Sequence, residues 1–290
     1  MIESTLINEA SYVIENYLCG QAVGEITANI LYGIVNPSAH LSGTFPLKYE
    51  DNPSILDYGA HHDHVNYMEG VFVGYRYYDR KNMDALFPFG HSLSYTTFSY
   101  SNLRFNKEGF KDIENVQCHV DVTNIGPVFG KCVVQLYVSD NTNYENRPLK
   151  ELKGFKKLSL QPGEMKTVDI ELNKRSFEYW NTEIHDWYAP TSEYEILIGN
   201  SSRDIRIQGK VHVESTKKNI HFVTNNSTFV DVYDDPITKP ALDKLLADFP
   251  NQKEWMDSND EEHEFWRICV RDFSTFKILK FLIQNHFAYK

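Results

Sequence analysis

The chain has 290 residues, and its 41% hydrophobic and 24% charged residues are those of an ordinary globular protein, with a length that predicts about two domains. Its formal net charge of −11 argues against phosphate backbones and anionic membranes as partners. No run of about 18 apolar residues is present, so no membrane span is expected.

The first 47 residues predict one clear helix. Residues 11–18 fit a strand or a short helix equally well, whereas residues 25–33 have the spacing of an amphipathic helix. Gly33 is placed to cap its C-terminal end. The apolar residues that share one face of this helix are Ile26, Ile30 and Leu31. Residues 41–47 form a short apolar run that Pro46 interrupts.

Residues 49–66 predict a polar loop that contains four possible metal ligands. These are His61, His62, Asp63 and His64. Imidazole and carboxylate suit zinc or nickel, but adjacent loop residues rarely converge on one ion without a distant further ligand. A solvated loop is therefore the favoured interpretation, and a metal site at His61, His62 and His64 is the alternative. No metal or cofactor is predicted.

Residues 67–97 are unusually rich in Tyr and Phe. The alternation of Val71, Val73 and Tyr75 with Phe72 and Gly74 predicts a strand buried on both faces. The sequence Phe-Pro-Phe-Gly at 87–90 predicts a stiff bend, because Pro fixes φ and Gly adopts whatever φ the turn requires. We expect an aromatic hinge packed between two domains.

From residue 99 the sequence changes to short alternating segments separated by turns, which predicts an all-β sandwich of the immunoglobulin size class. The expected strands are residues 99–105, 115–124, 132–140, 152–160, 166–172, 193–199 and 203–209. Turns with Gly or Pro are expected at residues 124–127, 161–164 and 198–200. Trp180 and Trp187 flank an acidic loop and could stack on a sugar, although such a pair is more often part of a core.

The last 77 residues have a different character. Residues 240–246 predict a short helix with Pro in its first turn. Residues 265–287 predict one or two amphipathic helices. The residues at helical spacing there are Phe276, Leu279, Leu282 and Ile283. This tail is expected to pack against protein rather than to anchor the chain in a membrane.

The four cysteines are interpreted as free thiols. Cys118 is in phase with the valines of its segment and Cys132 with the apolar residues of the next, so both are expected to be small buried hydrophobic residues rather than halves of a disulfide. The N-terminus has no basic region followed by an apolar core, so no secretion signal is expected. A cytoplasmic location fits both observations.

Several segments together resemble the family 3 glycoside hydrolases, the β-glucosidase family. The matching segments are EGVFVGYRYYD (69–79), LFPFGHSLSYTTF (86–98), CGQAVGEITANILYGIVNPSAHLSGTFP (19–46), VTNIGPVFGKCVVQLYVSD (122–140), RPLKELKGFKKLSLQPGEMKTVDIEL (147–172) and YEILIGNSSRDIRIQG (194–209). The resemblance covers residues 11–285 but less than half of a full family member.

The resemblance implies an α/β fragment followed by an all-β immunoglobulin or fibronectin III-like sandwich and a short helical C-terminal extension. Residues 1–98 would be the C-terminal part of an α/β sandwich domain with its linker. Residues 99–213 would be a fibronectin type III-like β-sandwich able to fold alone, and residues 214–290 the helical extension. A partial sheet exposes an edge and apolar faces, so the first segment is expected to be the least stable.

The family resemblance also implies a retaining β-glycosidase in which a (β/α)8-type barrel supplies an aspartate nucleophile and the α/β domain a glutamate acid/base. Nothing in this sequence matches either motif. Glu25 and Glu69 lie within similar stretches, but Glu25 fits the first turn of a helix and Glu69 the start of a strand. No catalytic, cofactor-binding or metal-binding residue is therefore assigned, and the chain alone is expected to be inactive.

Three interpretations stay open. The leading one is the C-terminal part of a β-glucosidase-like hydrolase that acts on β-glucosides only with a barrel, which a separate chain could supply; a homo-oligomer is also possible. The second is a carbohydrate-binding or protein-interaction module whose stacking residues are Trp180, Trp187 and Tyr188. The third is a metal-binding protein that uses the histidine loop.

Overall fold

The computed structural model describes residues 7, 9–59, 63–140, 147–182, 184–217 and 239–246. The chain divides into two units, one of residues 1–180 and 187–217, the other of residues 181–186 and 218–290. Among the described residues, no helix is long and apolar enough to cross a membrane.

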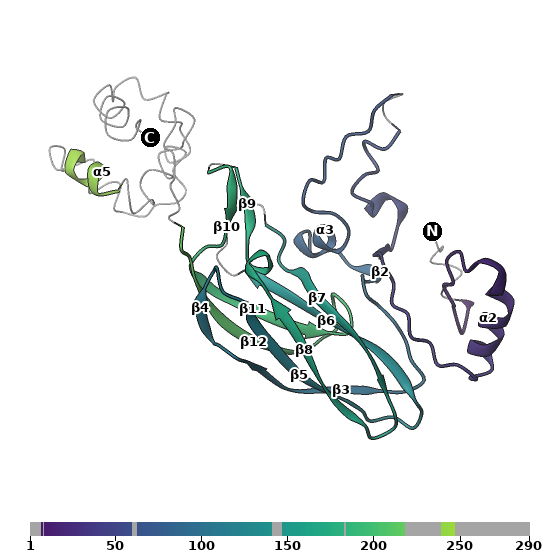
Figure 1. Ribbon diagram of the computed structural model, residues 1–290. Helices are drawn as coiled ribbons and strands as arrows, with labels where there is room; N and C mark the ends of the chain where they lie inside the picture. The colour runs from purple at the N-terminus through teal and green to yellow at the C-terminus, as the bar shows by residue number, and fades with distance from the viewer. Residues whose placement is uncertain are drawn as a thin grey trace. The chain divides into compact units, whose positions relative to one another are not determined.

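A two-layer β-sandwich dominates the first unit (Figure 1). Its strands are β3 (Phe98–Phe105), β4 (Gly109–Lys111), β5 (Val116–Asn124), β6 (Gly130–Asp140), β7 (Glu151–Leu160), β8 (Met165–Leu172), β11 (Ser192–Gly199) and β12 (Ile205–Glu214). One sheet has the order β4-β12-β11-β6-β7 and the other β3-β5-β8. All pairs are antiparallel except β12 with β4, which is parallel.

All seven strands expected in this region are present. The structure adds β4 and a two-stranded hairpin, β9 (Tyr179–Asn181) with β10 (Asp186–Tyr188). These additions are only three residues long, too short for an alternating pattern to reveal them. A 3-10 turn, η3 (Lys174–Ser176), follows β8.

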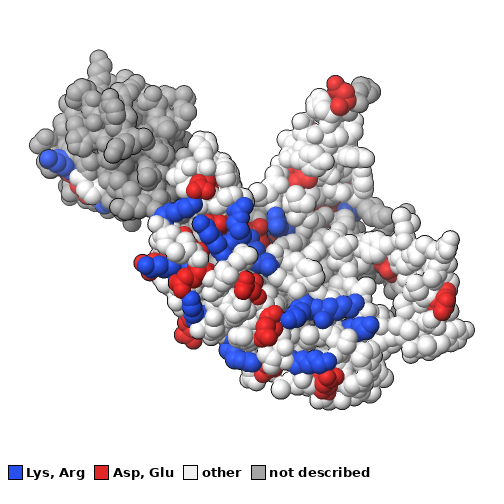
Figure 2. Space-filling model, in the orientation of Figure 1, with Lys and Arg blue, Asp and Glu red and all other residues white. Residues whose placement is uncertain are grey.

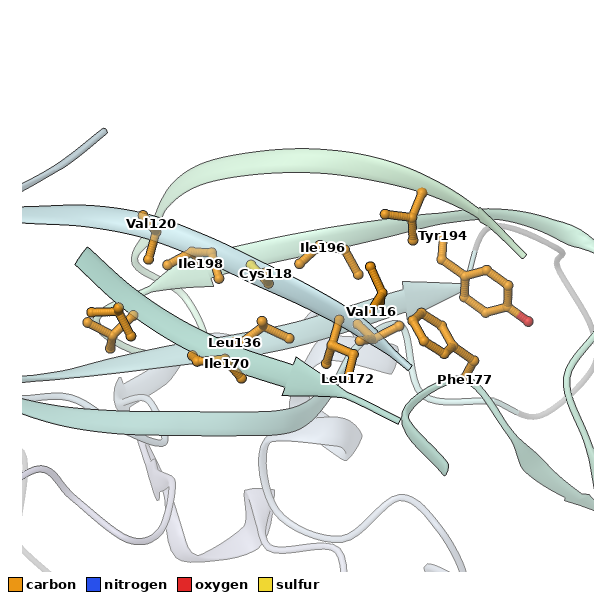
Figure 3. Packing of buried hydrophobic residues seen from close by; sticks show 14 of the residues in the cluster. Val116, Cys118, Val120, Leu136, Ile170, Leu172, Phe177, Tyr194, Ile196 and Ile198 are labelled. Carbon is orange, nitrogen blue, oxygen red and sulfur yellow. The ribbon is translucent and has the colours of Figure 1, made fainter. Parts of the chain in front are cut away.

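The core lies between the two sheets, where alternate residues of facing strands interlock (Figure 3). On β5 the inward residues Val116, Cys118 and Val120 are at most 1% exposed. Residues of β6 and β11 in the other sheet face them across the core, including Leu136 and Ile196, and Leu172 lies beside Val116 on the neighbouring strand β8. A period of two along each strand therefore buries one full face.

Both sandwich cysteines occupy this core, as the sequence predicted. Cys118 and Cys132 are free thiols and each is 1% exposed. Burial raises the pKa of Cys118 to about 12 and that of Cys132 to about 11, because a thiolate would lose its hydration there. Neither is a reactive nucleophile at neutral pH.

The N-terminal part of the first unit is assembled from short elements. They are η1 (Gly20–Ala22), α2 (Val23–Leu31), β1 (Phe45–Pro46), η2 (Tyr49–Asp51), α3 (Tyr75–Arg80) and β2 (Ala85–Phe87). β1 pairs antiparallel with β2, and the rings of Phe45 and Phe87 meet edge to face. The predicted helix is confirmed as α2, and Gly33 follows it with φ +68. Its amide donates to the carbonyl of Ile30, which ends the helix.

Two expectations for this region were wrong. Residues 11–18 form neither a strand nor a helix. The alternating stretch at 71–75 is not a buried strand: Val71 and Val73 are 54% and 55% exposed, and helix α3 begins at Tyr75. Gly74 has φ +60 and ψ −132, a conformation that ends any extended run and turns the chain into the helix.

In the second unit the described helix is α5 (Lys239–Leu246), which confirms the short helix expected there with Pro240 in its first turn. The amphipathic helices expected within residues 265–287, with Phe276, Leu279, Leu282 and Ile283, lie outside the described residues.

Candidate functional site

The most densely connected polar site lies where the aromatic linker crosses the outer face of the five-stranded sheet. We call it the linker anchor. Its residues are His40, Tyr75, Asp79, Phe89 and Gly90 from the N-terminal part, and Gln135, Tyr137, Lys150, Leu152 and Arg203 from the sandwich.

Gln135 on β6 holds the linker bend. Its Nε2 donates to the carbonyl oxygens of Gly90 at 3.2 Å and Asn200 at 2.8 Å, and its Oε1 accepts from the hydroxyl of Tyr137 at 2.5 Å. A Cβ on Gly90 would lie 2.3 Å from this Oε1, and Gly90 has φ +79. Only glycine satisfies both the close approach and the left-handed backbone.

His40 fastens the same bend from the N-terminal side. Its Nδ1–H donates to the Gly90 carbonyl at 2.6 Å, which leaves Nε2 as the acceptor for the Ser92 hydroxyl at 3.1 Å. Burial lowers the pKa of His40, and the nearby positive charge of Lys157 acts in the same direction. The neutral imidazole is therefore the form that the anchor holds.

Aromatic rings form the centre of the anchor. Tyr75 stacks on Phe89 with ring centroids 5.1 Å apart and meets Tyr137 edge to face at 5.9 Å. The Tyr75 hydroxyl accepts the backbone N–H of Leu152 at 2.8 Å, beside the register shift in the β6–β7 pairing. Burial raises the pKa of both Tyr75 and Tyr137, so both stay protonated hydrogen-bonding groups.

A buried carboxylate completes the anchor. Asp79 Oδ2 lies 2.6 Å from Lys150 Nζ, and its Oδ1 lies 2.7 Å from Arg203 Nε. The Asp79 side chain is 4% exposed, so the two cations supply the compensation that a buried charge requires. Arg203 also donates to the carbonyl of Met83 at 2.9 Å, which ties the β11–β12 loop to the linker.

The local sequence explains how one short helix supplies these groups. Residues three and four apart share a helix face, so α3 presents Tyr75, Tyr78 and Asp79 together, and these are its buried residues. Tyr75 and Phe89 pack as the aromatic hinge prediction expects, whereas the position of this hinge between two domains stays a prediction. Asp79 was expected to break the aromatic run in a polar loop and instead lies buried in this helix, although an acidic residue among aromatic ones was a usable signal. Gln135 was a second such signal, because it interrupts an apolar run.

The two glutamates that lie within the family-like stretches are Glu25 and Glu69. Glu25 is exposed in the first turn of α2, and Glu69 is partly exposed in a turn before α3. Among the described residues, no hydrogen bond or ion pair joins either carboxylate to another side chain. A retaining glycosidase needs two carboxyl groups about 5 Å apart, so neither glutamate is assigned a catalytic role.

The histidine loop is described only in part. His64 Nδ1 lies 2.8 Å from Asp63 Oδ1, in an exposed position. His61 and His62 lie outside the described residues. Within the part that is described, no three His, Cys, Asp or Glu residues are grouped as metal ligands. The metal site stays a prediction.

The tryptophan pair does not present a flat stacking surface. Trp180 is 49% exposed, but its ring meets Trp187 edge to face, at 75°. The guanidinium of Arg175 covers the Trp187 ring at 3.3 Å from its centroid, and Tyr188 is 5% exposed. Of the three proposed stacking residues, Trp180 is the most exposed.

Comparison with known proteins accounts for the two parts that the anchor joins. Residues 2–95 match the glycosyl hydrolase family 3 C-terminal domain, and residues 132–202 match the fibronectin type III-like domain. The chain corresponds to the C-terminal part of the family 3 glycoside hydrolases.

The relatives include enzymes with different substrates in their names. The chain is 46% identical over 266 residues to thermostable β-glucosidase B of Acetivibrio thermocellus, an alignment that covers 89% of this chain and 35% of that enzyme. It is 39% identical over 238 residues to an exo-α-(1→6)-L-arabinopyranosidase of Bifidobacterium breve, covering 82% of this chain and 31% of that enzyme. This chain thus spans about a third of the length of these relatives.

Solved structures agree with the sequence matches. The crystal structure of the Bifidobacterium adolescentis family 3 β-glucosidase superimposes with a TM-score of 0.70 at 36% identity, over 79% of this chain and 33% of that one. The Kluyveromyces marxianus β-glucosidase in complex with glucose superimposes with a TM-score of 0.68 at 38% identity, over 73% of this chain and 25% of that one.

Proposed function

We propose that this chain supplies the C-terminal, non-catalytic part of a retaining β-glucosidase-like glycoside hydrolase. The observation that carries the proposal is the linker anchor, which fastens residues matched by the family 3 C-terminal domain to the fibronectin type III-like sandwich. Its role would be to hold those residues in a fixed orientation, because catalytic groups tolerate little displacement.

The finer domain organisation belongs to this proposal. Residues 1–98 would complete an α/β sandwich domain, residues 99–213 would form the fibronectin type III-like domain, and residues 214–290 a helical extension. The mostly β structure and the position of the two family matches support this division.

The chemistry would come from a catalytic barrel. A retaining enzyme needs an ionised carboxylate to attack the anomeric carbon and a protonated carboxyl group to protonate the leaving oxygen. Among the described residues, no hydrogen bond or ion pair joins the Glu25 or Glu69 carboxylate to another side chain. We therefore infer that hydrolysis requires a barrel polypeptide, whether it precedes these residues in one chain or is a separate partner.

The sugar preference is left open within this proposal. The relatives named above include a β-glucosidase and an arabinopyranosidase, so the substrate is best described as an O-glycoside with a small terminal sugar.

The test is reconstitution. The 290-residue chain would be assayed on nitrophenyl β-glucoside and nitrophenyl α-L-arabinopyranoside. Each substrate would be tested with the chain alone and with the chain mixed with a second polypeptide. That polypeptide is the part of the Acetivibrio thermocellus enzyme that lies outside its alignment with this chain. The positive control is that enzyme's own C-terminal part. We expect activity only in the mixtures. Hydrolysis by this chain alone would contradict the proposal. So would the absence of hydrolysis in its mixture when the control mixture is active.

A further inference from the structure

A cluster of basic side chains lies beside the linker anchor, where β7 begins. Glu151 is at its centre: its Oε1 lies 3.2 Å from Arg76 Nη2, and its Oε2 lies 3.1 Å from Lys153 Nζ. These three side chains are between 17% and 31% exposed, so water and salt screen their charges only in part. One carboxylate therefore faces two cations, of which one comes from α3 and the other from the sandwich.

The sheet itself sets the position of Lys153, because this residue is the extra one in a β-bulge. Leu136 of β6 pairs with Gly154 and Tyr137 pairs with Leu152, so the pairing passes over Lys153. Bulges re-aim a side chain and are frequent next to functional sites. The Lys153 ammonium group is thus held in place by an irregularity of the strand and differs from an ordinary surface lysine.

Arg147 adds a third positive group to the cluster. It precedes β7 and pairs with Asp140 at the end of β6, and both side chains are less than 15% exposed. Burial lowers the pKa of Lys153, and the positive charges of Arg147 and Arg76 act in the same direction, whereas Glu151 opposes them. The ammonium group therefore lies within the field of two guanidinium groups and has one carboxylate beside it.

The cluster and the linker anchor together carry an excess of positive charge. Among the described residues, their ion pairs join five basic side chains to three carboxylates, which gives a formal charge of +2. The basic residues are Arg76, Arg147, Lys150, Lys153 and Arg203, and the acidic ones are Asp79, Asp140 and Glu151. Residues 1–75, by contrast, contain nine Asp or Glu and a single basic residue, Lys48. Figure 2 shows blue side chains mainly over the sandwich, whereas the N-terminal part is mostly white with scattered red. Partly buried cations require counter-charges, so the excess favours a bound anion.

We propose that Arg76, Arg147 and Lys153 form a binding site for a phosphoryl group, present either as free phosphate or as the phosphate ester of a sugar. A guanidinium group donates two parallel N–H bonds to an oxyanion, and an ammonium group adds a compact charge with three donors. A tetrahedral group with three or four oxygens uses such a set of donors more fully than a carboxylate with two. Because Arg76 belongs to α3 and the other two residues to the sandwich, the bound anion adds a bridge between the linker and the sandwich. No step of glycoside hydrolysis uses this site, so it goes beyond the proposed function.

The test uses inorganic phosphate and the full 290-residue chain. Isothermal titration calorimetry would measure binding, with chloride at matched ionic strength as the reference. Lys153→Met removes one donor and leaves Arg76 and Glu151 as an equal pair. It should raise the dissociation constant about tenfold or more, which is the loss expected for one charge-assisted hydrogen bond. Lys156→Met is the matched control, since Lys156 is an exposed lysine of the same strand, and it should leave the constant unchanged. Circular dichroism would confirm that both variants fold.

A second variant tests the same site with the opposite sign. Glu151→Gln removes the negative charge beside the proposed anion and preserves the shape of the side chain, so it should bind phosphate more tightly than the unmodified chain. In chloride this variant should lose stability, because the Arg76 and Lys153 charges stay without their carboxylate. Phosphate should then raise its urea midpoint by more than it raises that of the unmodified chain. This comparison holds even if Lys153→Met does not fold.

Phosphate binding that Lys153→Met weakens and Lys156→Met leaves unchanged would support the site. Competition by a glucose phosphate ester would then identify the ester as a ligand, and its failure to compete would identify the free ion. Absence of phosphate binding by the unmodified chain would overturn the proposal. Equal effects of the two lysine variants would overturn it as well, because they would indicate an adventitious ion only. So would a Glu151→Gln variant that binds phosphate no more tightly than the unmodified chain.

Discussion

Replacing Asp79 by Ala should release the linker from the sandwich without unfolding the sandwich itself. The substitution removes the carboxylate that lies 2.6 Å from Lys150 and 2.7 Å from Arg203. Both cations would then stay at the anchor with no counter-charge. Leaving a buried charge unpaired is the most costly way to break an ion pair.

The magnitude follows from how exposed each partner is. The Lys150 side chain is 14% exposed, which places its pair with Asp79 in the buried class, where loss of one partner costs about 3–5 kcal/mol. Arg203 is 35% exposed, so water compensates most of its loss and its share is about 0–1 kcal/mol. Because Lys150 has a long side chain that can reach towards water, we take the low end and expect about 3 kcal/mol.

Native-state hydrogen exchange is the suitable assay, since it reads the opening of one region separately from global unfolding. A loss of about 3 kcal/mol corresponds to exchange about 100-fold faster for the amides of α3 and of Leu152. The amides of β5 are the internal reference and should keep their protection. Asp79→Ala combined with Lys150→Met should recover part of the loss, because it removes one of the two uncompensated charges.

The reasoning would be refuted if α3 in Asp79→Ala exchanged within about threefold of the unmodified rate. It would also fail if the double variant were as destabilised as the sum of two independent losses. That outcome would mean that the carboxylate and the ammonium do not interact across the anchor.

Two further predictions concern the same anchor. Gly90→Ala should lower the free energy of unfolding by about 2–3 kcal/mol, because it adds backbone strain at φ +79 and displaces Gln135. Gly163→Ala is the control, since Gly163 has φ +76 with open space around it, and it should cost about 1 kcal/mol. Urea midpoints would compare the two variants, and equal losses of stability would contradict the close approach of Gln135 to Gly90. Burial lowers the pKa of His40 and of His91, so the folded chain binds fewer protons than the unfolded one and its stability should decline as pH falls below about 6.5. Urea midpoints at about pH 7.5 and about pH 5.5 would measure this decline, which His40→Asn should reduce, and an unchanged slope in that variant would refute the assignment.

The sandwich could be predicted closely because each strand is buried on one face. Apolar and polar residues therefore alternate along the strand, and this alternation can be read from a few neighbouring residues. Val116, Cys118, Val120 and Val122 are all at most 1% exposed, as their alternation indicates. The seven predicted strands differ from the observed ones by a few residues at their ends, where pairing rather than pattern sets the limit.

The linker anchor could be predicted only in part. The aromatic residues signalled a packed hinge, but the contacts of this region join Tyr75, Asp79 and Gly90 to residues 45–124 positions later in the chain. Sequence periodicity reports which side of an element is apolar, not which distant carboxylate meets which lysine. The single Gln in the apolar run of β6 is informative for that reason, because a buried amide must have partners.

The wrong strand prediction at residues 71–75 shows the limit of a local pattern. Alternating Val71, Phe72 and Val73 indicate burial, and the local pattern is sound, yet the two valines are more than half exposed in this chain. Natural sequences seldom carry a run of apolar residues that nothing covers, because each local feature tends to agree with the complete fold. Local alternation reports that Val71 and Val73 suit a buried position, but it does not report that Gly74 turns the chain into helix α3.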